Sequence, residues 1–295
     1  MSSPDPKLSI VTAIHNACAI NEIFWESLSA HTSVPFELIL IDNHSTDGSG
    51  EYFAALAASR LPEGQSIVYL QNAKNQSYPR SQNQGMAVAR ADILVFMNND
   101  VWMPHGWHLP FEKALTENPL LILSPSGQEA QPTQSASDEL KSNWRKIETQ
   151  SKLWKMIFRR SEKERLQWAL RRMYGDLENF VSPTLSQDKK YFNGIKGDTV
   201  IFHRKLRDVM PEIWDEQFQA ADWHLYLSAA KRHESNKDFP LPRVLLDSYV
   251  HHFGRYSIKK SNVEDFWTDA RFVSIEDHWG RDTIQRLWWG YHLPA

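Results

Sequence analysis

Short apolar runs alternate with helix-length segments over the first 125 residues of the chain. The runs are four to seven residues long, are rich in Ile, Val and Leu, and comprise Leu8–Ile14, Glu37–Ile41, Ile67–Leu70 and Ile93–Met97. Their apolar residues are nearly continuous, which is typical of strands buried on both faces of a parallel sheet. The segments between them have apolar residues at helical spacing. Strands joined by helices through short connections predict an α/β sheet with right-handed crossovers.

This alternation stops near residue 126 and resumes later. The segment Gln128–Ser137 is polar and reads as a loop, and Lys141–Gly175 contains no proline and repeats its apolar residues at helical spacing. We therefore predict one long helix or a helical hairpin there. After Pro183 the pattern predicts strands at Thr199–Phe202 and Val244–Leu246, and helices at Asp222–Lys231 and Asn262–His278.

Composition narrows the class of protein. The chain has 295 residues, 41% of them hydrophobic, which is enough for a substantial core. The formal charge of -3 gives no support for a nucleic-acid partner, and the single Cys18 rules out an internal disulfide and a Cys-rich zinc site. No apolar run approaches the roughly 20 residues that span a bilayer. The polar start, Met1–Lys7, does not read as a secretory signal, so a soluble, cytoplasmic protein is expected.

Carboxylates follow two of the predicted strands, at the sheet edge where α/β proteins bind ligands. Asp42 and Asp47 come after the second strand, and Asp100 ends the fourth. Asp42 could accept a hydrogen bond from a uracil or a ribose, and Asp100 could hold Mg²⁺ or Mn²⁺, which prefer oxygen ligands. The structural alternative is that these residues make Asx turns and cap the next helix. Spacing alone leaves both interpretations open.

Four stretches taken together resemble the family-2 glycosyltransferases, which have the GT-A fold. They occur in the family's order and at about its spacing: Leu8–Asn16, Ile41–Ser49, Ser77–Arg90 and Leu94–Asp100. Ile41–Ser49 is similar to the family's VDNGSTDGS stretch, and Tyr78–Gly85 to FARANNQG. Asn98-Asn99-Asp100 is similar to its degenerate DxD motif.

The resemblance resumes in the later part of the chain and covers about residues 7–125 and 190–258. Phe192-Asn193-Gly194 followed by Val200–Arg204 resembles the strand G-x-x-x-x-I-R-R, and Trp214–Phe218 resembles FDERF. Ala221–Leu225 falls on the EDxDL motif, and Tyr249–Ser257 resembles HxGGxS. The resemblance implies an α/β GT-A fold (Rossmann-like, the nucleotide-diphospho-sugar transferase type) with a mixed, mostly parallel sheet.

The resemblance also implies roles for individual residues. Asp42 would contact the nucleobase or ribose of a nucleotide sugar, Asn98 would lie near the ribose or sugar, and Asp100 would bind Mn²⁺ or Mg²⁺. His252 would lie near the diphosphate and the metal, and Asp222 would be the catalytic base. The remaining candidates are Ala13, His15, Asn16 and Asn99 at the nucleotide, Arg80 and Lys74 at phosphate or sugar, and Trp223, His224 and His251 toward the acceptor.

These residue types suit inverting transfer of a sugar from a nucleoside diphosphate to a hydroxyl of a glycan, lipid-linked or protein acceptor, as in polysaccharide biosynthesis. The acceptor hydroxyl needs a base, and the departing diphosphate needs its charge stabilised by a metal. A nucleotidyltransferase would carry a Gly- and Lys/Arg-rich loop where this chain has Ile14–Cys18. Ala221 replaces the family's glutamate and His224 its later aspartate, so a non-catalytic, sugar-nucleotide-binding scaffold stays the alternative.

The family does not explain Lys141–Gly175, which has eleven Lys/Arg and three Glu, a local charge of +8. Three interpretations stay open: peripheral contact with an anionic membrane, recognition of an acidic polymer or protein acceptor, and simple packing on the sheet or a second subunit of a homo-oligomer. We divide the chain into a nucleotide-sugar half (1–125), a basic helical insertion (126–188), an acceptor half (189–258) and a helical C-terminal extension (259–295).

Overall fold

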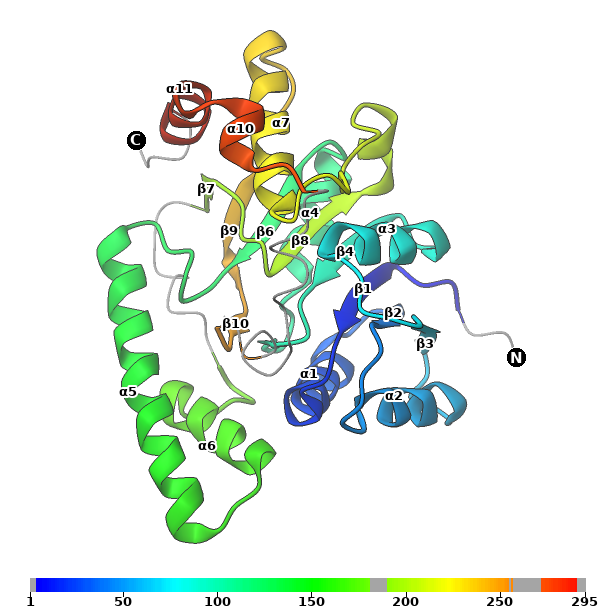
Figure 1. Cartoon of the computed structure of the whole chain (residues 1–295), viewed down its shortest axis with the longest axis vertical. Coiled ribbons are helices and arrows are strands. Elements are labelled where there is room, and N and C mark those ends of the chain that lie inside the picture. Colours follow the sequence, from blue (N-terminus) through cyan, green and yellow to red (C-terminus); the bar gives the residue numbers. More distant parts are fainter. Residues whose placement is uncertain (1–3, 181–189, 255, 257–271, 291–295) are drawn as a thin grey trace.

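The computed structural model describes residues 4–180, 190–254, 256 and 272–290. Its centre is an eight-stranded sheet in the order β3-β2-β1-β4-β8-β6-β9-β7 (Figure 1). The strands are β1 (Leu8–Ile14), β2 (Phe36–Asp42), β3 (Gln65–Gln71), β4 (Ile93–Met97), β6 (Ile122–Ser126), β7 (Tyr191–Asn193), β8 (Thr199–His203) and β9 (Arg243–Tyr249). A second, two-stranded sheet pairs β5 (Val101–Trp102) with β10 (His251–His252).

The main sheet is mixed and mostly parallel, as predicted. Four of its pairings are parallel, and the three antiparallel ones involve β8 or β7. All seven residues of β2 are buried, which explains the apolar run Leu38–Ile41 within it, and the buried Glu37 is paired with Ser9 and Arg90. The observed strands extend the predicted ones by one or two residues at β2 and β3, whereas β5, β6, β7 and β10 were not predicted.

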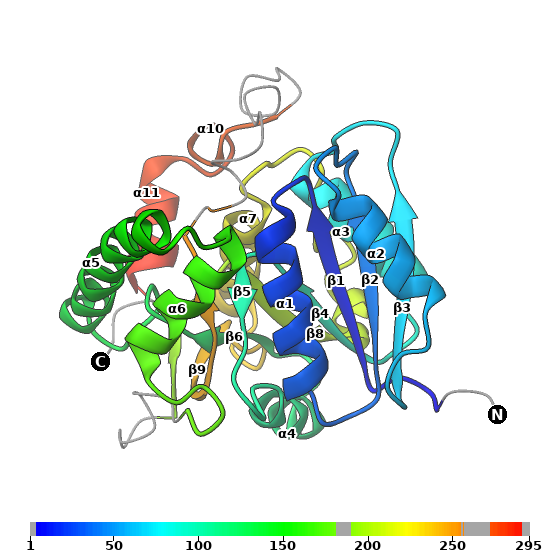
Figure 2. The same ribbon diagram turned by 90° about the horizontal axis from the view of Figure 1, so that it is seen from below.

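Helices cover both faces of the sheet (Figure 2). On one face α1 (Cys18–His31), α2 (Ser49–Ala58) and α4 (Leu109–Glu117) contribute Phe24, Phe53 and Phe111 to one core cluster. On the other face α3 (Tyr78–Val88) and α7 (Ala221–Ser235) pack over a second cluster, together with the chain after the short helix η1 (Arg204–Asp208). On α3, a Cβ at Gly85 would overlap the Val11 side chain, so only glycine permits this close approach to β1.

The basic insertion forms a helical hairpin, the second of the two predicted forms. It consists of α5 (Gln134–Phe158) and α6 (Glu162–Tyr174). The helices separate at Arg159, whose φ is 49°, and Ser161 begins α6 with a capping box to Glu164. Trp144, Ile147, Leu166 and Leu170 pack with Ile20, Ile23, Trp102 and Phe253. The hairpin therefore rests on α1 and on the small sheet.

The described C-terminal part consists of short helices beside α7: α10 (Ile275–Trp279), α11 (Arg281–Ile284) and η2 (Gln285–Trp289). Of the helix predicted over Asn262–His278, residues 262–271 lie outside the described residues, and the observed helix begins after its cap, Ser274. Leu287 is fully buried against Tyr226 and Leu227 of α7. Among the described residues, no helix combines the length and the apolar character needed to cross a membrane.

Candidate active site

The loops after β1 and β2 lock together at the carboxyl edge of the sheet. Asn16, whose φ is 61°, donates its backbone N–H to Ser45 Oγ at 2.9 Å, and its Oδ1 accepts the Thr46 N–H at 2.7 Å. His15 Nδ1 donates to the Asn43 carbonyl at 2.7 Å. These contacts hold the two loops in register, and Ala13 lies partly buried just before them.

Asp42 is fully buried at the end of β2, and both of its carboxylate oxygens already accept hydrogen bonds. Oδ1 accepts from the Ser45 N–H and Oδ2 from the Tyr69 hydroxyl, each at 2.8 Å. Asp47 caps the neighbouring helix starts, because it accepts from the N–H groups of Cys18 and Ser49. The structural interpretation therefore describes Asp47, and it describes Asp42 in part, because Asp42 Oδ1 holds the local turn at Ser45. Each Asp42 oxygen has a further lone pair that can accept a hydrogen bond.

Asp100 and His252 meet in the interior beside the small sheet. His252 Nε2 lies 3.2 Å from Asp100 Oδ1, and the Tyr256 N–H donates to Asp100 Oδ2 at 3.0 Å. Burial would raise the pKa of Asp100, but the His252 charge and these hydrogen bonds outweigh it, so this pKa is lowered. Burial likewise opposes a charged His252, yet the Asp100 and Asp198 carboxylates raise the pKa of His252 well above its ordinary value. The pair is ionic.

Two further carboxylates complete this cluster, and sequence reasoning missed both. His252 Nδ1 lies 3.1 Å from Glu129 Oε2 and 3.4 Å from Asp198 Oδ2. Asp198 is buried and pairs with the buried Lys196 Nζ at 2.6 Å. Ligand atoms of Glu129, Asp198 and His252 all lie within 4.8 Å of one another. Two carboxylates and one imidazole are a donor set that suits a divalent cation such as Mn²⁺, so these residues fit the metal that the resemblance implies.

Asp222 lies next to this cluster, on the first turn of α7. A Cβ at Gly197 would overlap Asp222 Oδ2. Because glycine has no side chain, the Asp222 carboxylate can approach the backbone next to Asp198, just before β8. Burial and the Asp198 charge raise the pKa of Asp222, against the backbone hydrogen bonds that lower it. Tyr78 also lies here, with its hydroxyl 3.5 Å from the Gly197 carbonyl oxygen.

Several predicted residues lie away from this cluster. Neighbouring residues on a strand point to opposite faces, and His251 accordingly faces the hairpin, with Nδ1 2.8 Å from the Tyr174 hydroxyl. His224 stacks on Phe218, and burial lowers its pKa to about 4. Trp223 is 39% exposed and stacks on Trp288 with ring centroids 4.9 Å apart.

The remaining candidates from the donor side differ in exposure. Asn99 is buried and donates to Asn21 Oδ1 at 2.6 Å, which connects the Asn98-Asn99-Asp100 stretch to α1. Asn98 is partly buried, with its N–H bound to the Asp198 carbonyl at 2.8 Å. Lys74 and Arg80 are exposed. Ser257 of the last motif lies outside the described residues.

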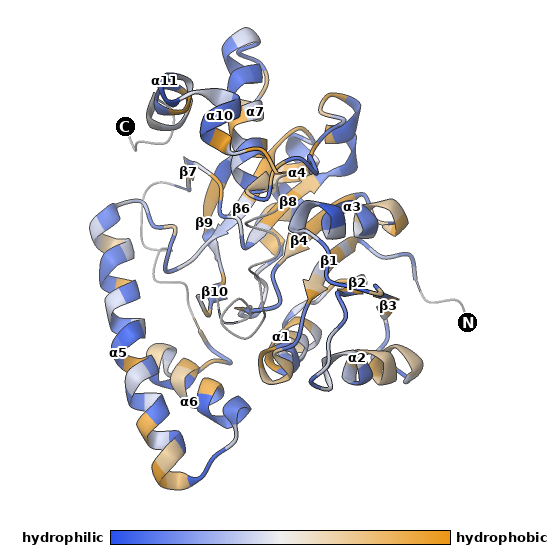
Figure 3. Ribbon diagram, viewed as in Figure 1, coloured by the Kyte–Doolittle hydropathy of each residue, from blue (hydrophilic) through white to orange (hydrophobic). Residues whose placement is uncertain are grey.

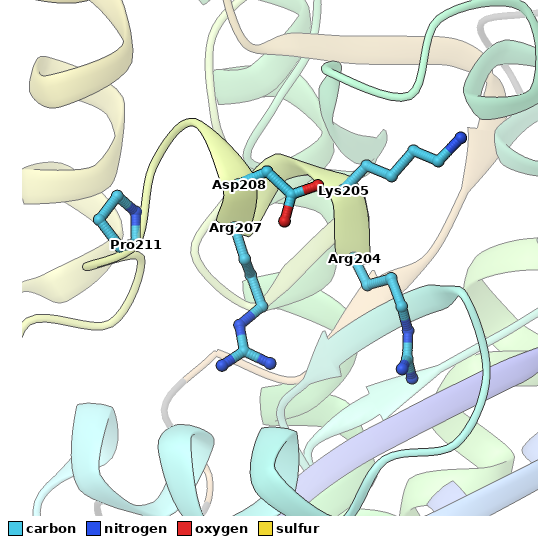
Figure 4. Close-up of a pocket in the computed structure, with 5 residues that line it drawn as sticks. All are labelled: Arg204, Lys205, Arg207, Asp208 and Pro211. Carbon is cyan, nitrogen blue, oxygen red and sulfur yellow. The ribbon is translucent and has the colours of Figure 1, made fainter.

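A surface hollow of about 410 Å³ lies at the opposite edge of the sheet, on the turn that follows β8. Figure 4 shows the residues that line it: Arg204, Lys205, Arg207, Asp208 and Pro211. The Arg204 guanidinium donates to the carbonyls of Ala89 and Ala91. Arg204 therefore joins η1 to the end of α3. The hollow lies at the other edge of the sheet from Asp42 and Asp100.

The chain has similarities to curated proteins and to solved structures. The chain is 28% identical over 89 residues to polypeptide N-acetylgalactosaminyltransferase 4 of Caenorhabditis elegans, a match of 30% of this chain and 14% of that relative's length. Among solved structures it resembles a mannosyltransferase from Pyrobaculum calidifontis in complex with GDP-Man and Mn²⁺, with a TM-score of 0.54 and 13% identity over 84% of this chain and 57% of that one. It also resembles S. aureus TarS, with a TM-score of 0.47 and 13% identity over 86% and 62%.

The structural likeness shows a shared GT-A fold, as predicted. The sequence model described as glycosyl transferase family 2 matches residues 9–174, which is more than half of the chain. The matched range holds the loops at Asn16 and Asp42, the Asn98-Asn99-Asp100 stretch and the whole helical hairpin. The chain is a member of glycosyl transferase family 2.

Proposed function

We propose that the chain is a metal-assisted, inverting glycosyltransferase that moves a sugar from a nucleoside-diphosphate sugar to an acceptor hydroxyl, with Asp222 as general base. The observation that supports this most is the meeting of two kinds of carboxylate at one place. Asp222 approaches the Gly197–Asp198 segment, and Asp198 faces His252 on the other side. The proposed base and a cluster suited to a divalent cation therefore both lie beside the segment that precedes β8.

The roles divide between these groups. Asp100 and the Nε2 atom of His252 would hold a divalent cation, and the cation would supply positive charge to the departing diphosphate. Glu129 and Asp198 face the other imidazole nitrogen, Nδ1, and would orient the ring by accepting its hydrogen bond. Ligation requires neutral imidazole, so binding would displace the proton that Asp100 and Asp198 now stabilise on His252. The Lys196 ammonium group would stay paired with Asp198 when the divalent cation binds.

Asp222 would take the proton of the acceptor hydroxyl. The acceptor oxygen then bonds to the anomeric carbon as the bond from that carbon to the diphosphate breaks, and the nucleoside diphosphate leaves with the electron pair. A raised pKa makes Asp222 a stronger base than an ordinary aspartate. Its partly buried position limits competition from water. Acceptors with a free hydroxyl, whether glycan, lipid-linked or protein, fit this scheme.

The test is the anomeric configuration of the product. The protein is incubated with Mn²⁺, a set of nucleoside-diphosphate sugars and oligosaccharide or lipid-linked acceptors, and released nucleoside diphosphate is quantified. Proton NMR of the product should then show the anomeric configuration opposite to that of the donor. Retention of configuration would refute the single-step mechanism. Binding of the donor without any release of nucleoside diphosphate would favour the scaffold alternative. The replacement of the family's glutamate by Ala221 does not by itself support that alternative, because the Ala221 side chain is fully buried in the core.

A further inference from the structure

The end of the helical hairpin carries an exposed apolar cluster. Leu153, Met156, Ile157 and Phe158 are 54%, 69%, 61% and 58% exposed, and we call these four residues the apolar tip. The described residues contain eight exposed large hydrophobic side chains, so half of them gather within six positions of α5. Figure 3 shows this hydrophobic end of α5. Such clustering marks an interaction site, because scattered exposed apolar residues are ordinary and contiguous ones are not.

The apolar tip does not belong to the contact between the two helices. Leu153, Met156 and Ile157 follow the i, i+3, i+4 spacing of a single helix face. The neighbouring Trp154 points elsewhere and stacks on Trp168 of α6, with centroids 5.5 Å apart and planes at 19°. Figure 1 shows the α5–α6 turn at the end of a helical pair that stands beside the sheet. The apolar tip is therefore presented outward at the end of this projection.

Cations surround the apolar tip. Lys152, Arg159 and Arg160 are exposed around it. From residue 152 to 165 the chain has six Lys/Arg and two Glu, although its total formal charge is -3. Arg165 is buried against Glu162 and Lys163 is paired with Glu22, so the charge of the tip comes mainly from the three exposed cations. Exposed apolar side chains flanked by Lys and Arg are the combination by which amphipathic helices enter the interface of an anionic bilayer. A nucleic acid would use the cations but not the exposed Ile157 and Phe158.

We infer that the apolar tip is a docking surface for an anionic lipid bilayer, with its four apolar side chains in the headgroup region and the surrounding cations on the lipid phosphates. A second copy of the chain is the less fitting occupant, because symmetric contact would bring Arg159 and Arg160 against their own counterparts. This inference does not depend on the proposed function.

The hairpin is connected to the candidate active site through Tyr256. Its hydroxyl donates to Glu162 Oε1 at 2.8 Å, at the start of α6, and its backbone N–H donates to Asp100 Oδ2 at 3.0 Å. Lys163 adds a second connection, because its Nζ lies 2.8 Å from Glu22 of α1. Docking would therefore hold the site close to the bilayer. Given the proposed function, that position favours a lipid-linked acceptor.

Vesicle flotation of the full chain tests the docking surface. The protein is mixed at low salt with vesicles of phosphatidylcholine alone or with 30 mol% phosphatidylglycerol added (a mixture chosen on the order of natural anionic content), and the bound fraction is measured. The variants are Ile157→Glu with Phe158→Glu, and Arg159→Gln with Arg160→Gln. The matched control is Leu109→Glu, an equally exposed leucine on α4, with 53% exposure. Thermal unfolding checks that each variant is folded, and light scattering measures its mass.

Wild type should bind only the anionic vesicles, and 0.5 M salt should weaken the binding, with screening over a few ångströms (about 4 Å). The apolar double variant should lower the partition coefficient about tenfold or more. Each lost cation should lower it about fivefold. Leu109→Glu should leave it unchanged. The inference is overturned if wild type ignores anionic vesicles, if both double variants bind like wild type, or if the apolar variant instead turns a dimer into a monomer.

Discussion

Replacing Asp222 with Asn tests the assignment of the catalytic base, because it removes the proton acceptor and keeps the shape of the side chain. Asp222 lies on the first turn of α7 and its carboxylate contacts Gly197, and an asparagine side chain fits the same space. The chemistry therefore changes while the fold and the neighbouring cluster of Asp198 and His252 stay in place. Asp238→Asn is the matched control, because Asp238 is an exposed aspartate beyond the end of the same helix.

The expected loss follows from the role of the group. A positioned general base contributes about 10²- to 10⁴-fold to a rate, so Asp222→Asn should lower the single-turnover rate by at least about a hundredfold. Donor affinity should change less than about threefold, because Asp222 is not among the proposed metal ligands. Asp238→Asn should leave both quantities at their wild-type values.

The raised pKa of Asp222 adds a pH signature, and its sign can be worked out. Burial and the Asp198 charge keep the proton on Asp222 to a higher pH than in the unfolded chain, whose aspartate pKa is about 3.9. The single-turnover rate should therefore rise with pH through the raised folded pKa and then level off. For the same reason, the contribution of Asp222 to folding stability is present below the unfolded pKa and is lost as pH rises through the folded one. Asp222→Asn should thus be at least as stable as wild type at neutral pH.

The assay combines rapid-quench single turnovers across pH with thermal unfolding of the same samples. A slow but fully stable Asp222→Asn protein would support the base. Wild-type turnover in the variant, or an unchanged pH–rate profile, would refute the assignment. A variant that is slow because it has unfolded would show a lowered unfolding temperature, which the raised pKa argues against.

Three further predictions concern the surroundings of the base. Asp100→Ala should weaken Mn²⁺-dependent nucleotide binding more than about tenfold, as seen by calorimetry, while metal-free binding changes little; equal metal dependence in the variant would count against Asp100 as a ligand. Gly197→Ala places a methyl group on the Asp222 carboxylate, so single-turnover rates should fall strongly, and an active alanine variant would show that the close approach is unnecessary. Tyr256→Phe removes the hydrogen bond to Glu162 and should cost about 1.5 kcal/mol of unfolding free energy in urea, a value typical of bonds to charged groups; unchanged stability would disprove the connection.

Much of the fold could be predicted because its parallel half has a strong pattern. Strands β1, β2 and β4 are apolar at most positions because they are buried on both faces. Strand β6 gave no such signal, since its sequence, Ile-Leu-Ser-Pro-Ser, has polar residues at buried positions. Those serines are satisfied by tertiary partners: Ser126 Oγ donates to the Ser248 carbonyl at 2.6 Å, and Ser124 Oγ accepts the Lys196 N–H at 3.1 Å. No local pattern reveals such partners.

The residues of the candidate site likewise form two groups: those that the sequence could locate and those that it could not. Asp42, Asp100, Asp222 and His252 could be located because each lies in a recognisable motif at a strand or helix end. Glu129, Lys196 and Asp198 lie on connections without periodicity, and only the folded chain brings them to His252. Lys196-Gly197-Asp198 did carry one signal, which is a charged pair around a glycine directly before a buried strand.

The geometry of a strand limits what can be predicted for the two adjacent histidines. Because successive side chains of a strand point to opposite faces, His251 and His252 cannot both face the same metal. The structure assigns His252 to the carboxylate cluster and buries His251 against Trp144, with ring centroids 4.2 Å apart. This choice depends on the position of the hairpin, which the sequence pattern does not specify.

The most direct test of the central claim, a metal-assisted nucleotide-sugar site at the carboxyl edge of the sheet, is a thermal-shift screen of UDP, GDP, dTDP and CDP with and without Mn²⁺. A ligand that binds only the folded chain stabilises it by about 2.7 kcal/mol at a hundredfold excess over Kd. We predict that one nucleotide raises the unfolding temperature only when Mn²⁺ is present, and that Asp100→Ala abolishes the shift. The absence of any shift with all four nucleotides, or a shift that Mn²⁺ does not change, would contradict the account.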